Sequence, residues 1–216
     1  MVLKITGDLQ PHVPARLAAC YRYDMPRSVD LLGRIRQNEA LVALLANTFE
    51  FDVRRANHTG TPRITSGKRL EAIAGDFTGG KYYLHGESII RPVWYASSEG
   101  EAGIIGANLT EALCLVVGLP YWRDCLKYSE NGNLLSMRAA ASHLQRDMLA
   151  HSPSIVAAQT RAAGALGLLI EPVLTLVERL HTSVQSADPD DVFLDETGEY
   201  DVLFGPFPPS RNRHWK

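Results

Sequence analysis

Apolar residues recur at intervals of three and four positions over much of the chain, which is the spacing of amphipathic helices. The pattern dominates the region after Gly132, where Ser152 and Pro153 give one helix an N-cap followed by proline. Earlier in the chain, Asn108 is followed three positions later by Glu111 in a variant of the capping box. Helices are therefore predicted over residues 28–51, 109–118, 121–129, 134–149, 153–170 and 172–185.

Between the first and second predicted helices, the pattern changes to short segments rich in aromatic and β-branched residues. The segments AIAGDF, KYYLHG and RPVWYAS are separated by turns that contain Thr-Gly-Gly and Gly-Glu-Ser. We expect an antiparallel meander, with Gly79 or Gly80 at positive φ in the first hairpin. Because the strands are grouped and do not alternate with helices, the predicted fold class is α+β, an antiparallel β-meander packed with helices and an additional C-terminal helical block.

The 216 residues are expected to form a single domain. Its core is the meander with the helix that follows, at about residues 70–127. A helical block follows at about residues 134–186, and an acidic, then proline-rich tail occupies about residues 187–216. For this tail the sequence leaves two forms open, a hairpin that turns at Thr197 and Gly198 or a strap across the core.

Composition and charge exclude several classes of protein. Hydrophobic residues make up 45% and charged residues 21% of the chain, as in ordinary globular domains. The 22 basic and 24 acidic residues give a net charge of −2, and the basic ones are scattered, so no nucleic-acid partner is expected. The most apolar segment, residues 162–177, is too short for a membrane span, and the first residues are too polar for a signal peptide. We therefore expect a cytoplasmic protein without a membrane partner.

The spacing of cysteine and histidine residues gives no sign of a metal or cofactor site. His143 and His151 are eight positions apart on a predicted helix, which is too far to chelate one ion. The segment TGGK at residues 78–81 lacks both ends of a phosphate-binding loop. We expect no metal and no cofactor. The three cysteines are expected to be reduced and structural, and they are Cys20, Cys114 and Cys125.

The run YASSEG at residues 95–100 raises the alternative of a small serine hydrolase. Ser97 could act as the nucleophile, with His85 as its base and Asp76 as the group that orients the histidine. The run lacks the GxSxG pattern, and each of the three residues is also a common choice for a turn or a strand end. The favoured interpretation therefore assigns no catalytic residue.

Under that interpretation, residues 95–106 form a strand-to-helix turn whose carboxylates serve recognition and helix capping. Glu99 and Glu101 are flanked by glycines, and negative charge is favourable at the start of a helix. Acidic side chains beside aromatic ones also suit a basic protein partner. The predicted partner-binding residues are Asp76, Glu87, Trp94, Tyr95, Glu99 and Glu101.

Four local patterns follow one another between residues 70 and 127. They are a Gly-Asp-x-x-Gly-Gly hairpin at 75–80, an apolar strand, a Ser-Glu-Gly turn at 98–100 and the helix pattern x-Leu-x-Glu-Ala-Leu at 108–113. In these patterns the chain resembles the SUKH superfamily, which includes a yeast cell-wall regulator and many bacterial immunity proteins. The resemblance implies an α+β domain, with helices around one sheet, that neutralises a cognate bacterial toxin by direct binding and has no enzymatic activity.

The sequence thus favours a non-enzymatic protein-binding module, specifically an immunity protein for a basic toxin domain. Two alternatives stay open. One is the serine hydrolase of Ser97, His85 and Asp76, and the other is a self-associating scaffold domain that pairs through the C-terminal helices. The oligomeric state is not specified by any pattern in the sequence.

Overall fold

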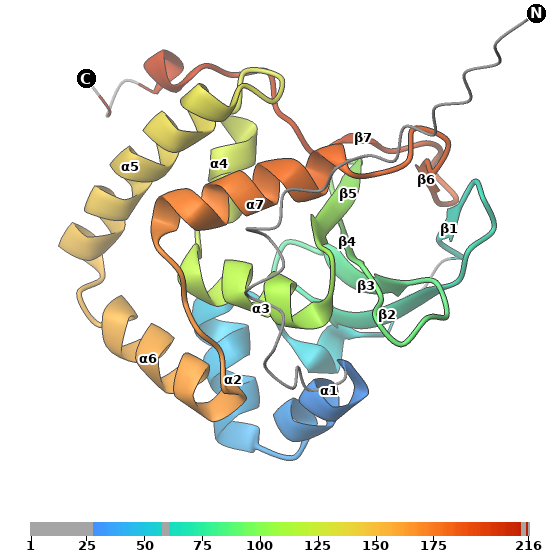
Figure 1. Cartoon of the computed structure of the whole chain (residues 1–216), viewed down its shortest axis with the longest axis horizontal. Coiled ribbons are helices and arrows are strands. Elements are labelled where there is room, and N and C mark those ends of the chain that lie inside the picture. The colour runs from blue at the N-terminus through green and yellow to red at the C-terminus, as the bar shows by residue number, and fades with distance from the viewer. Residues whose placement is uncertain (1–27, 58–60, 213–214, 216) are drawn as a thin grey trace, which may run out of the picture.

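The computed structural model describes residues 28–57, 61–212 and 215. In the described part of the chain there are seven α-helices, most of them after residue 108 (Figure 1). All five helices predicted in that region are present. The bounds are α1 (Ser28–Arg36), α2 (Glu39–Phe49), α3 (Leu109–Gly118), α4 (Trp122–Lys127), α5 (Leu134–His151), α6 (Ile155–Leu166) and α7 (Val173–Gln185).

The strands of the described residues form two sheets, and the predicted α+β class with a meander is confirmed. The main sheet has the order β2-β3-β4-β5-β7, in which the first four strands are antiparallel neighbours and β7 is parallel to β5. A separate antiparallel pair consists of β1 and β6. The bounds are β1 (Arg63–Ile64), β2 (Leu70–Gly75), β3 (Lys81–His85), β4 (Val93–Ala96), β5 (Glu101–Gly106), β6 (Phe193–Leu194) and β7 (Asp201–Val202).

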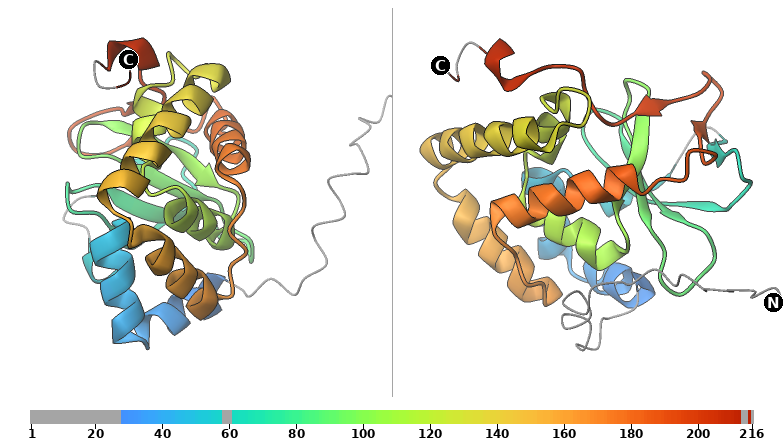
Figure 2. Two further views of the ribbon diagram at one scale, coloured as in Figure 1. Left: turned by 90° about the vertical axis from the view of Figure 1, so that its left-hand side faces the viewer. Right: turned by 45° about the horizontal axis from the view of Figure 1, so that its top comes forward.

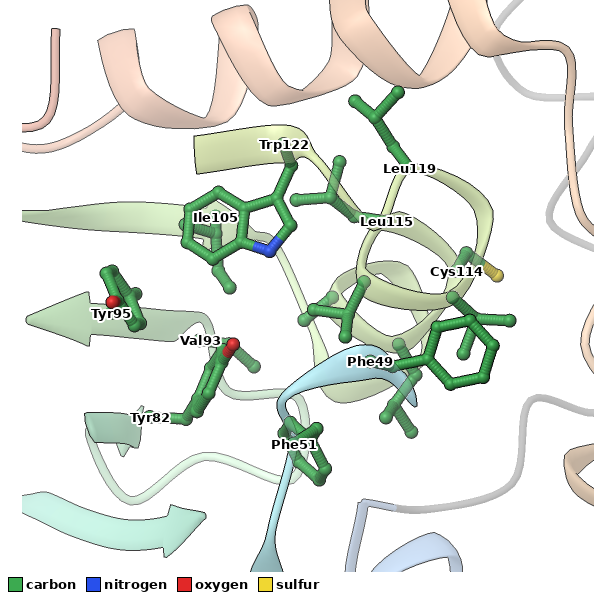
Figure 3. Close-up of a cluster of buried hydrophobic side chains, with 14 of the residues drawn as sticks. Phe49, Phe51, Tyr82, Val93, Tyr95, Ile105, Cys114, Leu115, Leu119 and Trp122 are labelled. Atoms are coloured by element: carbon green, nitrogen blue, oxygen red, sulfur yellow. The ribbon is translucent and has the colours of Figure 1, made fainter. Parts of the chain in front are cut away.

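One face of the main sheet packs against the helices. Successive residues of a strand point to opposite faces, and the cross-strand pair Tyr82 and Tyr95 lies on the face toward α3 and α4. Their rings lie 5.1 Å apart, and the Tyr95 ring meets the edge of Trp122 at 4.9 Å. Phe51 extends the aromatic cluster, with its ring 5.0 Å from that of Tyr82 (Figure 3). This cluster joins the sheet and the helices in one hydrophobic core.

The opposite face of the sheet carries a smaller core that the C-terminal segment covers. Tyr83 and Trp94 point to this side, and Phe193 of β6 lies over both, with ring centroids 5.5 and 6.3 Å away. Ile64 of β1 and Ile104 of β5 complete the cluster. One of the two forms left open for the tail, a strap, is therefore present, because a segment far along the chain covers the outer face of the meander (Figure 1).

The helical block adds an outer layer to the core. Helix α7 contacts β5, α5 contacts α4 and α7, and α6 contacts α2 and α3. The right-hand view of Figure 2 shows these helices on one side of the sheet and the C-terminal strap on the other. Among the described residues, no helix is long and apolar enough to cross a lipid bilayer.

The helix predicted over residues 28–51 is in fact two helices. The break falls between Arg36 and Glu39, where the Asn38 side chain accepts a hydrogen bond of 3.1 Å from the backbone N–H of Leu41. Asparagine is among the strongest N-cap residues, so it starts α2 in the middle of an otherwise continuous apolar pattern. The second helix ends at Phe49, and the next residue, Glu50, caps it with a left-handed backbone at φ of 53°.

Two local predictions are confirmed. Gly79 has φ of 105°, which lets the chain turn tightly between β2 and β3. At the start of α3, the side chain of Asn108 accepts a hydrogen bond of 3.0 Å from the N–H of Glu111. The Glu111 carboxylate in turn accepts one of 3.1 Å from the N–H of Ala107, which completes the capping box one residue earlier than the usual form.

The predicted strand-to-helix turn at residues 95–106 is wrong. The segment is a β-hairpin, because Glu101 starts strand β5 and α3 begins only at Leu109. Gly100, with φ of 92°, allows the tight turn. The two glutamates therefore lie at a hairpin turn and do not cap a helix.

The tail combines the two forms that the sequence left open. After β6 the chain reverses at Asp195, whose carboxylate accepts hydrogen bonds of 2.7 Å from the N–H and 2.6 Å from the hydroxyl of Thr197. Gly198, with φ of 134°, completes the turn. The chain then enters β7 and joins the edge of the main sheet.

Candidate protein-binding surface

Asp76 is a buried structural residue and was wrongly predicted to lie on a surface. Its side chain is fully buried, and Oδ1 accepts hydrogen bonds of 2.8–2.9 Å from the backbone N–H of Gly80 and from the N–H and hydroxyl of Thr78. Oδ2 accepts one of 2.6 Å from the Tyr95 hydroxyl. The Asp76 carboxylate therefore fixes the first hairpin turn and attaches it to β4.

Arg123 of α4 connects this carboxylate to the helices. Its guanidinium forms ion pairs with Asp76 and with Glu50, the residue that caps the end of α2. Burial lowers the pKa of Arg123, yet two carboxylates surround the group and keep it charged. Both carboxylate oxygens of Asp76 have hydrogen-bond partners within the protein. A fully satisfied buried network of this kind makes the local structure rigid, so Asp76 has a structural role.

The side chain of Ser97 also forms its hydrogen bonds within its own turn. Its hydroxyl donates a hydrogen bond to the Glu101 carboxylate and accepts bonds of 3.2 Å from the N–H of Glu99 and 3.0 Å from the N–H of Glu101. These bonds close the turn beyond the backbone bond of 2.8 Å from the N–H of Ser97 to the carbonyl of Glu101. The serine therefore shapes the hairpin, and its lone pairs are occupied.

His85 lies at the opposite end of the sheet from Ser97. In the register of β3 and β4, Lys81 pairs with Ala96 and Leu84 with Val93, so His85 is four residues along β3 from the strand end beside Ser97. At the rise of a strand this is roughly 13 Å. Asp76 is at the Ser97 end, and the three residues do not form a triad. The hydrolase alternative therefore has no site at these residues.

His85 instead belongs to the contact between the sheet and the C-terminal strap. Its ring meets the Trp94 ring edge-on at 5.8 Å, and its Nε2 lies 4.0 Å from the carboxylate of Asp191. Burial lowers the pKa of His85, the negative charge of Asp191 opposes this shift, and the positive charge of Lys68 adds to it. Burial works to raise the pKa of Asp191, but hydrogen bonds from Lys68 and Ser66 lower it overall.

The two aromatic residues predicted for partner binding are core residues. Trp94 and Tyr95 are each 2% exposed, and they point to opposite faces of the sheet. Adjacent residues of a strand cannot share a face, so the pair could not have formed one surface anchor. The exposed aromatic side chain near this end of the meander is Phe77, at 51%, with the Arg55 guanidinium 5.0 Å from its ring centroid.

The six predicted residues therefore do not make one acidic patch. Glu87 is exposed, but it follows His85 in the loop between β3 and β4, at the end of the sheet away from Glu99 and Glu101. Successive turns of a meander alternate between the two ends, which separates this glutamate from the others. Of the predicted set, only Glu99 and Glu101 share an accessible location.

A different set of carboxylates joins these two glutamates. In the parallel pairing of β5 and β7, Asp201 is the partner of Glu101, and its N–H donates a hydrogen bond of 2.7 Å to the carbonyl of Gly100. Glu199 is exposed two residues earlier. We name the four residues Glu99, Glu101, Glu199 and Asp201 the acidic edge. In the described part of the chain, none of the four forms an ion pair with a basic side chain.

Sequence reasoning missed Glu199 and Asp201 because the pairing of β7 with β5 spans about a hundred residues. A signal for them was present. Residues 188–201 contain seven acidic and no basic residues, a strong local bias in a chain whose overall charge is nearly balanced. No pattern in the sequence specified which edge of the sheet this segment would meet.

The two cysteines of the described residues are buried thiols. Burial raises the pKa of the Cys114 thiol to about 11 and also raises that of Cys125, so both remain protonated, free and structural as predicted. Cys20 lies outside the described residues. In the part of the chain that the structure covers, no three histidine, cysteine or carboxylate side chains are grouped to hold a metal ion.

Comparison of the chain with protein-family models, with curated proteins and with solved structures finds no match. The assignment of a function therefore depends on the geometry described above.

Proposed function

We propose that this chain is a non-enzymatic protein-binding module that holds a basic protein partner at the acidic edge. The SUKH resemblance of residues 70–127 supports the narrower proposal that the partner is a bacterial toxin domain and the chain its immunity protein. Such a partner would be met in the cytoplasm, where the chain is proposed to act.

The observation that carries the proposal is the pairing of β7 with β5. It places Asp201 opposite Glu101 and binds the backbone of Asp201 to Gly100, next to Glu99. The acidic C-terminal segment therefore lies beside the turn that carries Glu99. Carboxylates held together without a compensating cation repel one another, which is unfavourable for the free protein. A basic partner relieves that repulsion, and the charge complementarity speeds association and selects against acidic proteins.

An exposed apolar residue and a strand edge accompany the charges. Val202 is 68% exposed beside Asp201, and β7 is the last strand of the sheet. An apolar contact inside a charged rim is the usual arrangement of a protein interface. The unpaired side of β7 offers backbone hydrogen bonds as well.

The engagement of Ser97, His85 and Asp76 in structural contacts supports a binding role over a catalytic one. The serine and the aspartate accept hydrogen bonds from their own turns, and the histidine packs on Trp94. A nucleophile would need a base within hydrogen-bond reach, and His85 is too far along β3 to serve Ser97.

Co-expression with the toxin encoded by the neighbouring gene tests the proposal. We expect the wild-type chain to restore growth and to co-purify with the toxin domain as a complex. A double variant, Glu199→Lys with Asp201→Lys, should lose protection. The matched control, Glu87→Lys with Asp147→Lys, changes the net charge equally at exposed positions away from the acidic edge and should still protect. Equal protection by both variants, or an adjacent gene that encodes no toxin, contradicts the proposal.

Self-association through the helical block is a second candidate, because that block exposes several large apolar side chains. Leu135 is 72%, Leu169 82% and Val156 52% exposed. Exposed apolar residues of this size favour contact with another surface. The mass of the purified chain in solution, measured by light scattering across a range of concentrations, distinguishes a monomer from a self-associated scaffold.

A further inference from the structure

The first hairpin turn of the meander carries an exposed aromatic ring. Phe77, between β2 and β3, is 51% exposed, and no other aromatic side chain in the described part of the chain is comparably exposed. A phenylalanine that faces water costs free energy until another surface covers it. Because aromatic residues are enriched at the buried centre of protein interfaces, this ring is a candidate contact for a partner.

The ring of Phe77 is held in place although it faces solvent. The guanidinium of Arg55 lies over the ring, 5.0 Å from its centroid. Arg55 is itself fixed, because its Nη1 donates a hydrogen bond of 3.0 Å to the carbonyl of Asp76 and its Nε lies 3.6 Å from a carboxylate oxygen of Asp52. The buried Asp76 carboxylate closes the same turn. A partner therefore has little conformational freedom to remove at this ring, which favours tight binding.

This turn lies beside the acidic edge. A Cβ added to Gly79 would lie 3.5 Å from the Cβ of Ser98, so the first hairpin turn contacts the turn that carries Glu99. The sheet order places Asp201, the first residue of β7, three strands beyond β3. Three strand spacings correspond to about 14 Å. This span fits within a patch of about 800 Å² per partner, the size of a standard interface, so Phe77 and the acidic edge can meet one partner.

The charges on the two sides of this turn are opposite. Arg54 and Arg55 lie beyond the outer strand β2, where the backbone of Asp52 bridges to Gly75. Both guanidinium groups lie within 3.6 Å of the Asp52 carboxylate, whose single negative charge leaves a net positive charge on this flank. The acidic edge lies on the other side, on the turn at Glu99 and on β7. Opposite flanks of this kind hold a charged partner in one orientation.

We propose that Phe77 is the apolar anchor of the interface at the acidic edge, and that the partner offers an apolar pocket with basic residues on one side only. This inference rests on the proposed function and names the chemistry of the surface that binds there. The basic side of the pocket faces Glu99 and Asp201, because Arg54 and Arg55 repel it from the other flank. The anchor slows dissociation, whereas the charges speed association.

Selection from a random-peptide phage library on the immobilised full chain tests the anchor. We expect the enriched peptides to carry a large apolar residue with lysine or arginine grouped on one side of it. Synthetic copies should bind Phe77→Ala about tenfold more weakly than the wild type, through faster dissociation, and should bind Phe77→Trp almost as well as the wild type.

The matched control is Ile89→Ala. This change shortens another exposed apolar side chain, in the loop between β3 and β4 at the opposite end of the sheet, and should leave peptide binding unchanged. The unfolding midpoint of Phe77→Ala should stay close to that of the wild type, because half of the side chain is already in water. Weaker binding by this variant would then reflect the lost anchor and not a lost fold.

The double variant Glu199→Lys with Asp201→Lys separates this inference from the proposed function. We expect the peptides to lose affinity for this variant as well, through slower association. Peptides that lose affinity for the double variant but bind Phe77→Ala like the wild type overturn the anchor and leave the acidic edge in place. Peptides that lose affinity for Phe77→Ala alone contradict the acidic edge, and with it the proposed function.

Two further results overturn the proposal. One is a selection that enriches no peptide, or only peptides with basic residues on both sides of the apolar residue. The other is a dimer of the free chain, measured by sedimentation, that Phe77→Ala dissociates, since a second copy of the chain would then cover the ring.

Discussion

The hydroxyl of Tyr95 donates a hydrogen bond of 2.6 Å to the carboxylate of Asp76, and this contact joins the two hairpins of the meander. Asp76 directly follows the first strand of the meander, whereas Tyr95 lies on the third. Burial raises the pKa of Tyr95, so the phenol is a donor at any physiological pH. Two residues that the sequence suggested for chemistry and recognition therefore hold the fold together.

Loss of this bond should destabilise the protein. We expect Tyr95→Phe to lower the free energy of unfolding by about 1–3 kcal/mol, because Asp76 loses a buried donor. Asp76→Ala should cost about 3 kcal/mol or more, since Arg123 and the hairpin N–H groups also lose their acceptor. Urea unfolding measures both values. An unchanged midpoint for Tyr95→Phe would contradict the structural role of the pair.

The first hairpin predicts a contrast between glycines. Gly79→Val should cost more than about 1 kcal/mol because of the positive φ. Gly80→Ala should cost about 1–3 kcal/mol, because its new Cβ would lie 2.4 Å from the Tyr95 hydroxyl oxygen. The control is Gly164→Ala in α6, where nothing lies within 4 Å and alanine should stabilise by about 0.5–1 kcal/mol. Thermal melts measure the stability of the three variants. If only Gly164→Ala lowered the melting temperature, the structural roles assigned to Gly79 and Gly80 would be wrong.

The helix after the meander predicts a contrast between leucines. Leu113 of α3 is completely buried, and Leu113→Ala should lower the free energy of unfolding by about 2–5 kcal/mol. Leu135 of α5 is 72% exposed, and the same change there should stay within about 0.5 kcal/mol. Chemical denaturation of both variants checks the difference. A loss below about 1 kcal/mol at Leu113 would mean that α3 is not part of the core.

The strap predicts a pH dependence that belongs to His85. Its pKa in the folded protein is below the ordinary value of 6.5, so the unfolded chain binds a proton more readily. The contribution of the neutral histidine to stability is therefore complete above pH 6.5 and is lost as the pH falls below it. Asp191, whose pKa is also lowered, acts in a separate window below its ordinary value of 3.8.

Unfolding midpoints between pH 8 and pH 5 check this prediction, in the wild type and in His85→Gln. We expect the wild type to lose stability across that range by more than the variant does, because glutamine does not titrate. The six other histidines of the chain are present in both proteins and cancel in the comparison. Parallel curves for the two proteins would show that His85 does not titrate with a lowered pKa.

Much of the fold could be predicted because its causes are local. Asn108 and Glu111 predicted the start of α3, and the adjacent glycines Gly79 and Gly80 predicted the first hairpin. The helix at residues 28–51 was predicted too long, since apolar periodicity continued through the Asn38 cap. Element types thus followed from pattern, whereas one boundary depended on a single capping side chain.

The candidate surface could be predicted only in part because its causes are long-range. The sequence suggested Glu99 and Glu101. The C-terminal segment reaches the sheet edge beside them because Phe193 packs on Trp94 and β7 pairs with β5. The same long-range packing buried Asp76, Trp94 and Tyr95, which local reasoning had placed at the surface. Burial of a polar or aromatic residue is a property of the whole fold and is not encoded in its neighbours.

The affinity of the purified chain for the basic protein partner proposed above is the most direct test of the acidic edge. Calorimetry at low salt should show that Glu199→Lys with Asp201→Lys weakens binding by about tenfold or more, whereas Glu87→Lys with Asp147→Lys changes it little. The wild-type association rate should fall steeply as salt rises. Equal affinity of the wild type and the Glu199→Lys, Asp201→Lys variant would contradict the proposal that the acidic edge binds the partner.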